Sequence, residues 1–193
     1  MIEALATFFG LLCVWLTIKQ NILCWPTGLV QVFLYIFIFY DAKLYADMGL
    51  HIIYVGLGVY GWIYWRKSRQ SGQRTVTHAK NILTWILMML IGTVASGYGF
   101  TTFTDASVPY LDSLVVMASL IAQWLMARKK LESWFFWILA DIVAIGVYSY
   151  KDLYLTSGLY FVFLTMAITG YLTWRKDMRM RTQTQPADGI LIT

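Results

Sequence analysis

The sequence predicts an all-α integral membrane protein with seven transmembrane helices, and its composition, its apolar segments and their periodicity predict it together. Hydrophobic residues make up 59% of the 193 residues, charged residues make up 13%, and the mean hydropathy is +0.61. A soluble domain carries roughly 25% charged residues. The stretches between charges can cross a hydrocarbon layer of about 30 Å. Stretches such as NILTWILMMLIGTVASGYGF lack the period-two polarity of transmembrane strands.

The apolar stretches carry one formal charge, Asp141 in the sixth, and run over residues 5–18, 22–40, 48–65, 82–103, 113–127, 133–150 and 153–174. The first and fifth are short for a span, so we expect flanking residues to complete them. The first follows Glu3 with no basic segment before it, so we expect a retained span rather than a cleaved signal. The second begins near Pro26, which is tolerated at a helix start. The third and seventh end alike, in VYGWIYWRK and ITGYLTWRK.

Charge sets the predicted orientation, because Lys and Arg collect on the cytoplasmic side of membrane proteins. Of the 15 Lys and Arg residues, Lys43 and Lys151 lie at one set of helix ends and all the others lie at the opposite set. We therefore expect the N-terminus to face outward and the C-terminus to face the cytoplasm. This asymmetry accounts for the net charge of +5 without a nucleic-acid partner. The loop RKSRQSGQRTVTHAK and the polar tail at 177–193 are expected to be solvated and mobile.

The chain repeats itself after 109 positions, the shift that takes Trp65 to Trp174. At this shift, identical Trp, Gly and Tyr residues align without a gap, which composition bias alone does not produce. The aligned pairs are Trp15/Trp124, Trp25/Trp134, Tyr45/Tyr154, Gly49/Gly158, Gly61/Gly170 and Trp65/Trp174. A single span separates the two units, so both units enter the membrane in the same direction. The predicted domains are a first three-helix repeat at 1–67, a cytoplasmic loop and linker helix at 68–103, a second three-helix repeat at 104–176 and a polar cytoplasmic tail at 177–193.

Two parallel three-helix bundles joined by a central helix have a pseudo-two-fold axis along the membrane normal. Transporters with this arrangement bind their substrate near the midplane, between halves that rock. We interpret Trp65, Trp174 and the cations that follow them as interface anchors at the bundle ends, with ligand contact as the alternative.

Asp141 is the strongest candidate for a functional residue. An ionised carboxylate near the middle of a span costs about 2.5–3.5 kcal/mol, and no intramembrane Lys or Arg is available to pair with it. It is either a protonated or hydroxyl-bonded helix contact, or a functional group that acts as the counter-ion of a cationic substrate or as a proton site. Trp134, Trp137 and Tyr148 share its helical face, so aromatic ring faces could hold a flat cation beside it.

The other polar residues inside the spans are candidate binding groups with structural alternatives. His51 either contacts a ligand or makes a hydrogen bond near its helix end. Gln31 and Gln123 are either substrate ligands or hydrogen-bond partners between helices. The complete set of candidate substrate-binding residues is Asp141, Trp137, Trp134, Gln123, Tyr54, His51, Gln31 and Tyr148.

The sequence contains no Walker loop, HExxH motif or nucleophile elbow, so we expect neither an enzyme nor a cofactor or metal. Cys13 and Cys24 both lie within predicted spans and imply no disulfide framework. The expected partners are the lipid bilayer and a small-molecule substrate.

The motifs WPTGLV, LYADMGL, YGWIYW, SLIAQWLMARKK, ESWFFW and DLYLTSGLY, closed by WRK, resemble the PnuC family of bacterial vitamin transporters from Trp25 to Lys176. That family is similar in architecture to the SWEET sugar transporters, with a three plus one plus three helix plan, which agrees with the repeat. The resemblance implies facilitated diffusion across the bacterial inner membrane, with a periplasmic N-terminus. It also implies a homotrimer and trapping of the imported vitamin by a separate cytoplasmic kinase.

The resemblance implies nicotinamide riboside as the substrate, with thiamine as the alternative. This sequence departs from the nicotinamide riboside pattern at His51, where Gln is expected, and at Gly58, where Asn is common. Asp141 stands where Asn or Asp is found. Both vitamins are flat aromatic cations, so a carboxylate among tryptophan faces suits either of them.

We expect residues 5–67 to rock against residues 114–176 around the ligand, without coupling to ions. The expected contacts are stacking on Trp137 or Trp134 and bonds to Asp141, Gln123 and Tyr54. An intramembrane enzyme that uses Asp141 and His51 as acid and base is a second class of function, although their places along the helices do not favour direct contact. A non-transporting receptor is a third class, and it gives the repeat no natural explanation.

Overall fold

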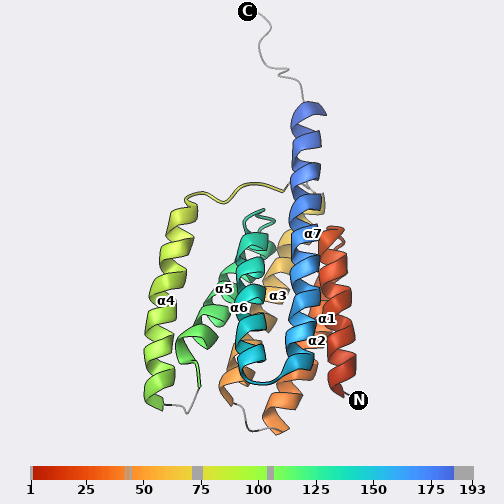
Figure 1. Ribbon diagram of the computed structural model, residues 1–193. Helices are drawn as coiled ribbons and strands as arrows, with labels where there is room; N and C mark the ends of the chain where they lie inside the picture. Colours follow the sequence, from red (N-terminus) through yellow and green to blue (C-terminus); the bar gives the residue numbers. More distant parts are fainter. Residues whose placement is uncertain (1, 42, 44, 71–75, 104–106, 185–193) are drawn as a thin grey trace, which may run out of the picture.

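The computed structural model describes residues 2–41, 43, 45–70, 76–103 and 107–184 (Figure 1). The helices in this part of the chain are α1 (Ile2–Ile18), α2 (Cys24–Asp41), α3 (Tyr45–Gln70), α4 (Ile82–Phe103), α5 (Pro109–Ala127), α6 (Ser133–Tyr150) and α7 (Tyr154–Thr184). Each helix overlaps one predicted stretch, so the prediction of an all-α protein is confirmed.

Five of the helices, α2, α4, α5, α6 and α7, are long and apolar enough to cross a membrane. Helix α1 is apolar but has only 17 residues, as its short apolar stretch predicts. Helix α3 has 26 residues but is not among these five, because its apolar span also carries His51 and several Gly, Tyr and Trp residues. The structure therefore supports a multi-pass membrane protein.

The turns that end α1, α2, α5 and α6 use a left-handed residue that is not glycine. The angle φ is 51° at Gln20, 58° at Lys43, 53° at Lys129 and 57° at Asp152. After α1 and α5, the next N–H donates to a carbonyl five residues back, Asn21 to Leu16 and Lys130 to Leu125, both at 2.9 Å. This is the Schellman motif, which satisfies the last carbonyls of a helix. The same stops thus recur 109 positions apart.

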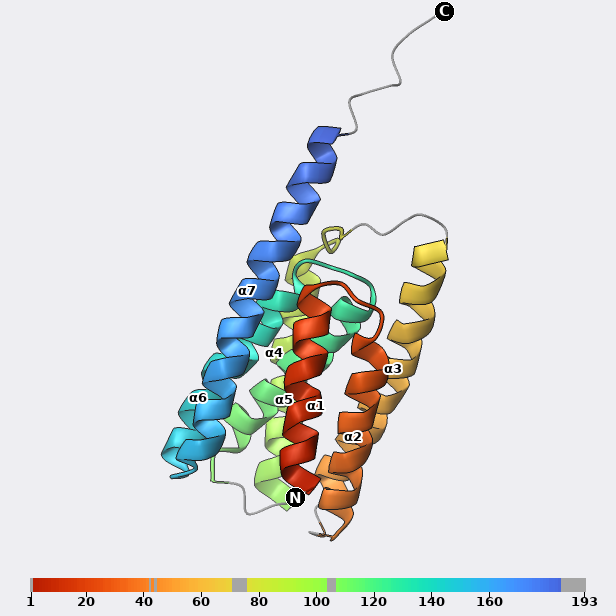
Figure 2. The same ribbon diagram turned by 90° about the vertical axis from the view of Figure 1, so that its right-hand side faces the viewer.

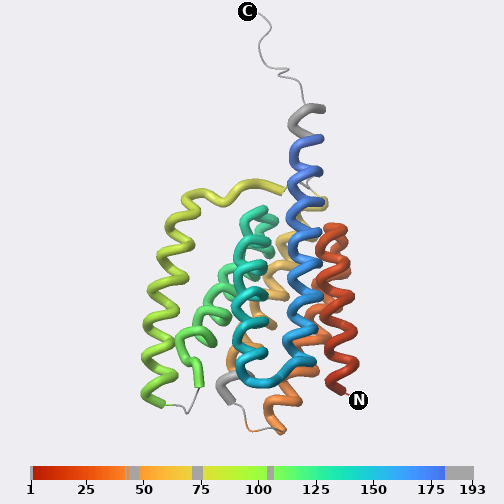
Figure 3. Tube along the Cα trace, in the orientation of Figure 1, coloured from red at the N-terminus to blue at the C-terminus, as the bar shows by residue number. Residues whose placement is uncertain are grey.

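The helix contacts also occur in equivalent sets. Helix α1 packs against α2 and α7, and α2 against α3, while α5 packs against α6 and α3, and α6 against α7. If α1, α2 and α3 are exchanged with α5, α6 and α7, this set is unchanged. Among the described helices, α4 packs against α5 alone, and it stands at one edge of the molecule (Figures 1 and 3).

Helix α7 extends beyond the other helices at one end of the bundle, as two perpendicular views show (Figures 1 and 2). We call this end the basic end, because α1, α3 and α5 also finish there and the flanking Lys and Arg residues follow them.

Four buried indole rings occupy the core near the basic end, and we call them the tryptophan quartet: Trp25, Trp65, Trp134 and Trp174. Trp25 packs edge-on against Trp65, with ring centroids 5.5 Å apart, and Trp134 packs edge-on against Trp174 at 5.4 Å. A Cβ atom at Gly61 would overlap the ring of Trp25, and one at Gly170 would overlap the ring of Trp134. The repeated glycines therefore make room for the repeated tryptophans.

The interpretation of Trp65 and Trp174 as interface anchors is wrong. Their exposed fractions are 2% and 0%, so neither ring is on the surface that faces lipid headgroups. The Trp65 Nε1–H donates to the Met126 carbonyl at 3.3 Å. The Trp174 Nε1–H donates to the carbonyls of Thr17 and Ile18, both at 3.2 Å. The Trp65 indole thus joins α3 to the end of α5, and the Trp174 indole joins α7 to the end of α1.

The loop and tail expected to be solvated and mobile are partly ordered in the described residues. Helix α3 continues to Gln70 and α7 continues to Thr184. Gln20 Nε2 donates to Asp177 Oδ2 at 2.9 Å, which fixes the α1 turn to α7. Residues 76–79 pack against the turn between α5 and α6, where Thr77 pairs with Lys130. The remainder of the predicted loop and tail, at 71–75 and 185–193, lies outside the described residues.

Candidate functional site

Asp141 lies on the face of α6 that turns toward the other helices. Its exposed fraction is 4%, and the small residues Ala140 and Ala144 beside it on the helix are also buried. No Lys, Arg or His lies within ion-pair distance of Asp141 in the part of the chain that the structure describes. A carboxylate buried without a cation is costly, so this site favours a bound positive charge.

Two tyrosines pair on α6 and α7, the first of them about two helical turns from Asp141. Tyr160 on α7 stacks on Tyr148 of α6, with ring centroids 5.2 Å apart and planes at 17°. The side chains of Tyr148 and Tyr160 are hydrogen-bonded. The charges of Asp141 and of Tyr54 on α3 also act on the Tyr160 hydroxyl. Tyr54 in turn shares a hydrogen bond with Ser119 of α5. We call Tyr54, Ser119, Asp141, Tyr148 and Tyr160 the central cluster.

The central cluster draws on α3, α5, α6 and α7, so it lies where the two halves of the chain meet. The structure brings together three residues that the sequence predicts for the site, Asp141, Tyr148 and Tyr54. It adds Tyr160 and Ser119, which the sequence analysis missed. One signal was available for Tyr160, because it lies 109 positions after His51 and so occupies the equivalent position.

His51 has an aromatic surrounding of its own. Its ring centroid lies 4.9 Å from Phe39, 5.6 Å from Tyr35 and 5.7 Å from Tyr54. The contacts of His51 with Phe39 and Tyr54 are the equivalents of the contacts that Tyr160 makes with Tyr148 and with Phe163. Through Tyr54, which belongs to both groups, His51 adjoins the central cluster.

The two predicted tryptophans of α6 differ in their surroundings. Trp137 is half-buried, lies about one helical turn from Asp141, and packs against both hydrophobic clusters of the core. Trp134 lies a further turn toward the basic end and belongs to the tryptophan quartet. Its Nε1–H has no hydrogen-bond partner within the described residues. Trp137 is therefore better placed than Trp134 to contact a ligand held by Asp141.

The two predicted glutamines also lie in different places. Gln123 is half-buried on α5 and follows Ser119 by one turn, so it shares the face that carries Ser119. The side-chain amide of Gln31 on α2 instead packs against α1, because a Cβ atom at Gly10 would come within 2.7 Å of its Nε2 atom. The structure does not bring Gln31 to the central cluster.

The chemistry of the central cluster is that of a polar, aromatic binding site. A buried carboxylate attracts a cation, stacked rings offer faces to a flat molecule, and hydroxyl groups can hydrogen-bond to a neutral polar substituent. Among the described residues, no three His, Cys, Asp or Glu side chains gather where they could hold a metal ion.

Comparisons with known proteins agree with these features. Residues 1–176 match the family model described as nicotinamide mononucleotide transporter. The chain is 26% identical over 210 residues to the nicotinamide riboside transporter PnuC of Escherichia coli (strain K12), covering 93% of this chain and 87% of that protein. It is 28% identical over 195 residues to the protein of the same name from Neisseria mucosa, covering 91% of this chain and 72% of that one.

A relative with a different named ligand is also similar. The riboflavin/roseoflavin transporter RibM of Streptomyces davaonensis is 24% identical over 200 residues, covering 96% of this chain and 91% of that protein. Among solved structures, the crystal structure of the vitamin B3 transporter PnuC superimposes with a TM-score of 0.71 at 25% identity, covering 93% of this chain and 82% of that one.

Proposed function

The chain belongs to the nicotinamide mononucleotide transporter family and is a membrane transporter, not an enzyme, and from this premise we propose that its substrate is nicotinamide riboside. The observation that carries the proposal is the burial of Asp141 within the helix bundle with no cation beside it in the described residues. The pyridinium ring of nicotinamide riboside supplies a flat cation for this carboxylate. Its ribose and carboxamide supply partners for hydroxyl and amide side chains.

The other named ligands fit these residues less well. The mononucleotide adds a phosphate, whose negative charge opposes the Asp141 carboxylate, and the Lys and Arg residues that could offset it lie at helix ends. Riboflavin is uncharged and leaves the carboxylate without a counter-charge. The relatives compared above are named for nicotinamide riboside or riboflavin, so the thiamine alternative is not favoured.

We infer a three plus one plus three arrangement, in which α1–α3 and α5–α7 are repeats and α4 links them. Its support is the recurrence of helix stops, helix contacts and tryptophan bonds after 109 positions. The domain boundaries at 67, 103 and 176 follow from it. Substrate movement by rocking of the two repeats, without ion coupling, is the mechanism that this arrangement favours.

The proposed location is the bacterial inner membrane, with the basic end in the cytoplasm and the N-terminus in the periplasm, because cytoplasmic helix ends collect Lys and Arg. A homotrimer and a cytoplasmic kinase that traps the imported vitamin follow from the family resemblance. Chemical cross-linking of the purified protein tests the trimer, and accessibility of the C-terminal tail to protease in oriented vesicles tests the orientation.

The substrate is tested by calorimetric titration of the purified protein with nicotinamide riboside, its mononucleotide, thiamine and riboflavin. We expect micromolar or tighter binding of nicotinamide riboside and at least tenfold weaker binding of the others. Counterflow of labelled nicotinamide riboside in proteoliposomes then separates a transporter from a receptor. Tight binding of riboflavin with none of nicotinamide riboside would overturn the substrate assignment.

Asp141→Asn tests the role of the carboxylate. We expect it to weaken nicotinamide riboside binding by more than about tenfold, because a tenfold change corresponds to about 1.4 kcal/mol, a modest part of a buried charge interaction. Asp152→Asn is the matched control, since Asp152 is an exposed carboxylate in the turn before α7. Unchanged affinity of Asp141→Asn would remove Asp141 from the site.

A further inference from the structure

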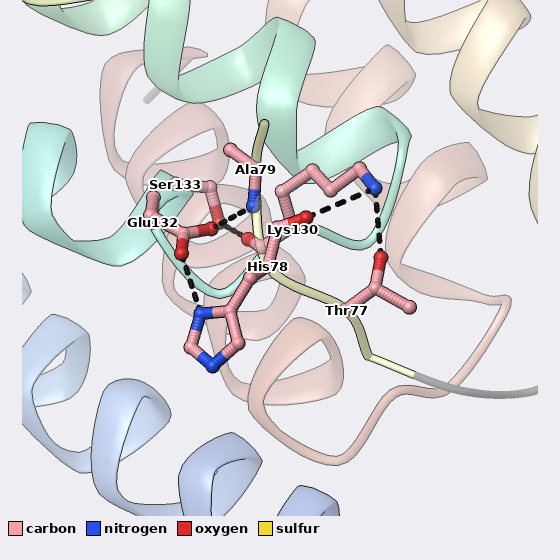
Figure 4. A network of polar contacts seen from close by, with 6 residues as sticks. All are labelled: Thr77, His78, Ala79, Lys130, Glu132 and Ser133. Atoms are coloured by element: carbon pink, nitrogen blue, oxygen red, sulfur yellow. Dashed lines mark hydrogen bonds and ion pairs between the residues drawn. The ribbon is translucent and has the colours of Figure 1, made fainter. Parts of the chain in front are cut away.

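Residues 76–79, which we call the strap, are docked on the turn that joins α5 to α6 (Figure 4). The Thr77 N–H donates to the Lys129 carbonyl at 3.2 Å, and the Leu131 N–H donates to the Thr77 carbonyl at 3.0 Å. These two bonds form an isolated parallel bridge between Thr77 and Lys130. A loop that only connected α3 to α4 would not need them.

Side chains of the turn hold the strap on both sides. Glu132 Oε1 lies 2.7 Å from His78 Nδ1, and Glu132 Oε2 accepts the Ala79 N–H at 2.6 Å. Lys130 Nζ donates to Thr77 Oγ1 at 2.8 Å and to the His78 carbonyl at 3.3 Å. The Glu132 side chain is 10% exposed, so its carboxylate depends on these bonds. Figure 4 shows Glu132 pointing from the turn toward the strap.

The strap inserts one apolar side chain into the core. Val76 is buried in the same hydrophobic cluster as the tryptophan quartet. The quartet lies where the two halves of the chain meet near the basic end, since Trp65 and Trp174 each bond across to the other half. Val76 therefore packs in a cluster to which both halves contribute.

The anchor belongs to one half only. The position equivalent to Glu132 is Leu23, which is exposed, and the position equivalent to Lys130 is Asn21. In the part of the chain that the structure describes, the hydrogen bonds of the strap to other segments all go to the α5–α6 turn, so the strap is expected to move with that turn. Val76 belongs to a hydrophobic cluster that also contains Trp25 and Trp65 of the other half, and this apolar packing can break without loss of a hydrogen bond.

We propose that the strap is the closure of the transport path at the basic end, and that Glu132 is its positioning residue. This inference rests on the transport function. When the two halves separate at the basic end, the strap moves with α5 and α6, Val76 leaves the tryptophan quartet, and the substrate is released on that side. When they approach again, Val76 returns and excludes water from the seam between the halves.

The experiment measures how fast a cysteine at position 76 reacts with a soluble maleimide. In Val76→Cys, without substrate, we expect labelling at least tenfold slower than in Lys80→Cys, which places the thiol on an exposed residue beside the strap. Adding Glu132→Gln should raise the rate at position 76 by about tenfold or more, and Glu132→Asp, which keeps a carboxylate, should restore much of the protection. The wild-type chain, with Cys13 and Cys24, gives the background.

The transport rate distinguishes a positioning role of Glu132 from a purely structural one. In proteoliposomes, Glu132→Gln should lower the maximal counterflow rate of nicotinamide riboside at least threefold and leave its half-saturating concentration within twofold. Equal labelling at positions 76 and 80, or no effect of Glu132→Gln on position 76, would overturn the proposal. If Glu132→Gln also exposes buried Cys24, the milder His78→Ala is judged by the same criteria.

The labelling measurements need no substrate, so they decide the strap independently. If the unaltered chain binds no nicotinamide riboside, the substrate assignment is wrong. The labelling rate at position 76 still decides whether the strap protects that position.

Discussion

At the basic end of the bundle, the two halves of the chain bury the same side chains in the same contacts, whereas in the middle they do not. Trp25 packs on Trp65 as Trp134 packs on Trp174. In the central cluster, by contrast, Asp141, Ser119 and Tyr160 stand where the first half has Val32, Gly10 and His51. The duplicated contacts make the scaffold, and the residues that differ form the proposed site for a ligand without two-fold symmetry.

The largest effect expected from this contrast is on stability at the basic end. Trp65→Ala and Trp174→Ala should each destabilise the protein by about 3–5 kcal/mol, because each removes a buried ring and leaves a cavity. The loss is measured as the temperature at which half of the size-exclusion peak disappears after heating. Trp15→Ala is the control, since Trp15 is 46% exposed. Equal tolerance of all three substitutions would restore the interpretation of Trp65 and Trp174 as interface anchors.

The paired glycines sharpen the same comparison. Gly61→Ala and Gly170→Ala should each cost about 1–3 kcal/mol, because the added Cβ atom overlaps a tryptophan ring that is buried and cannot move aside. The same heating assay checks this. Gly49→Ala and Gly158→Ala are matched controls, since they are also 109 positions apart and their added Cβ atoms meet nothing within 4 Å. A cost at only one of Gly61 and Gly170 would contradict equivalent packing in the two halves.

The middle of the molecule should respond in ligand binding rather than in stability. Ser119→Ala removes the hydrogen-bond partner of the Tyr54 hydroxyl. The affinity for nicotinamide riboside should fall about threefold to tenfold, since one such bond contributes about 0.5–1.5 kcal/mol. Ser96→Ala on α4 is the control, because the partner of the Ser96 hydroxyl within the described residues is the Gly92 carbonyl of its own helix, at 2.7 Å. A large loss of stability with unchanged affinity would move Ser119 from the site to the scaffold.

The sequence predicts the scaffold better than the site, and the reason is physical. Repeated Trp and Gly residues are visible at a fixed spacing, so the helices and their equivalence follow from the sequence alone. On helices that are apolar all round, however, periodicity does not tell which face meets protein and which meets lipid. Tyr160 and Ser119 were missed for this reason, and Trp65 and Trp174 were assigned to the wrong surroundings.

The docking of the strap could not be predicted from the sequence, for a different reason. The loop RKSRQSGQRTVTHAK is polar enough to predict a solvated segment, and the contacts that dock residues 76–79 on the α5–α6 turn are tertiary. Asp141 was predicted because its signal is local, since a single carboxylate within a span stands out whatever surrounds it.

The smallest expected effect tests how far the two halves make equivalent contacts at the basic end. Lys19 Nζ lies 4.0 Å from the ring centroid of Trp15, and the Arg128 guanidinium lies 4.3 Å from that of Trp124, so this cation–π pair is repeated. Arg128 alone also donates from Nε to the Tyr60 hydroxyl at 3.3 Å.

Because Tyr60 is on α3 and Arg128 follows α5, this bond joins the two halves, whereas the pair of Lys19 and Trp15 stays within α1 and the turn that follows it. In a double-mutant cycle, Arg128→Gln and Tyr60→Phe should show a coupling of about 0.5–1 kcal/mol, measured by thermal stability. Lys19→Gln and Thr169→Val, at the equivalent positions, should show none. Equal coupling in both cycles would mean that the contacts near Arg128 and near Lys19 join the two halves equally strongly. The halves would then differ in the central cluster and the strap alone.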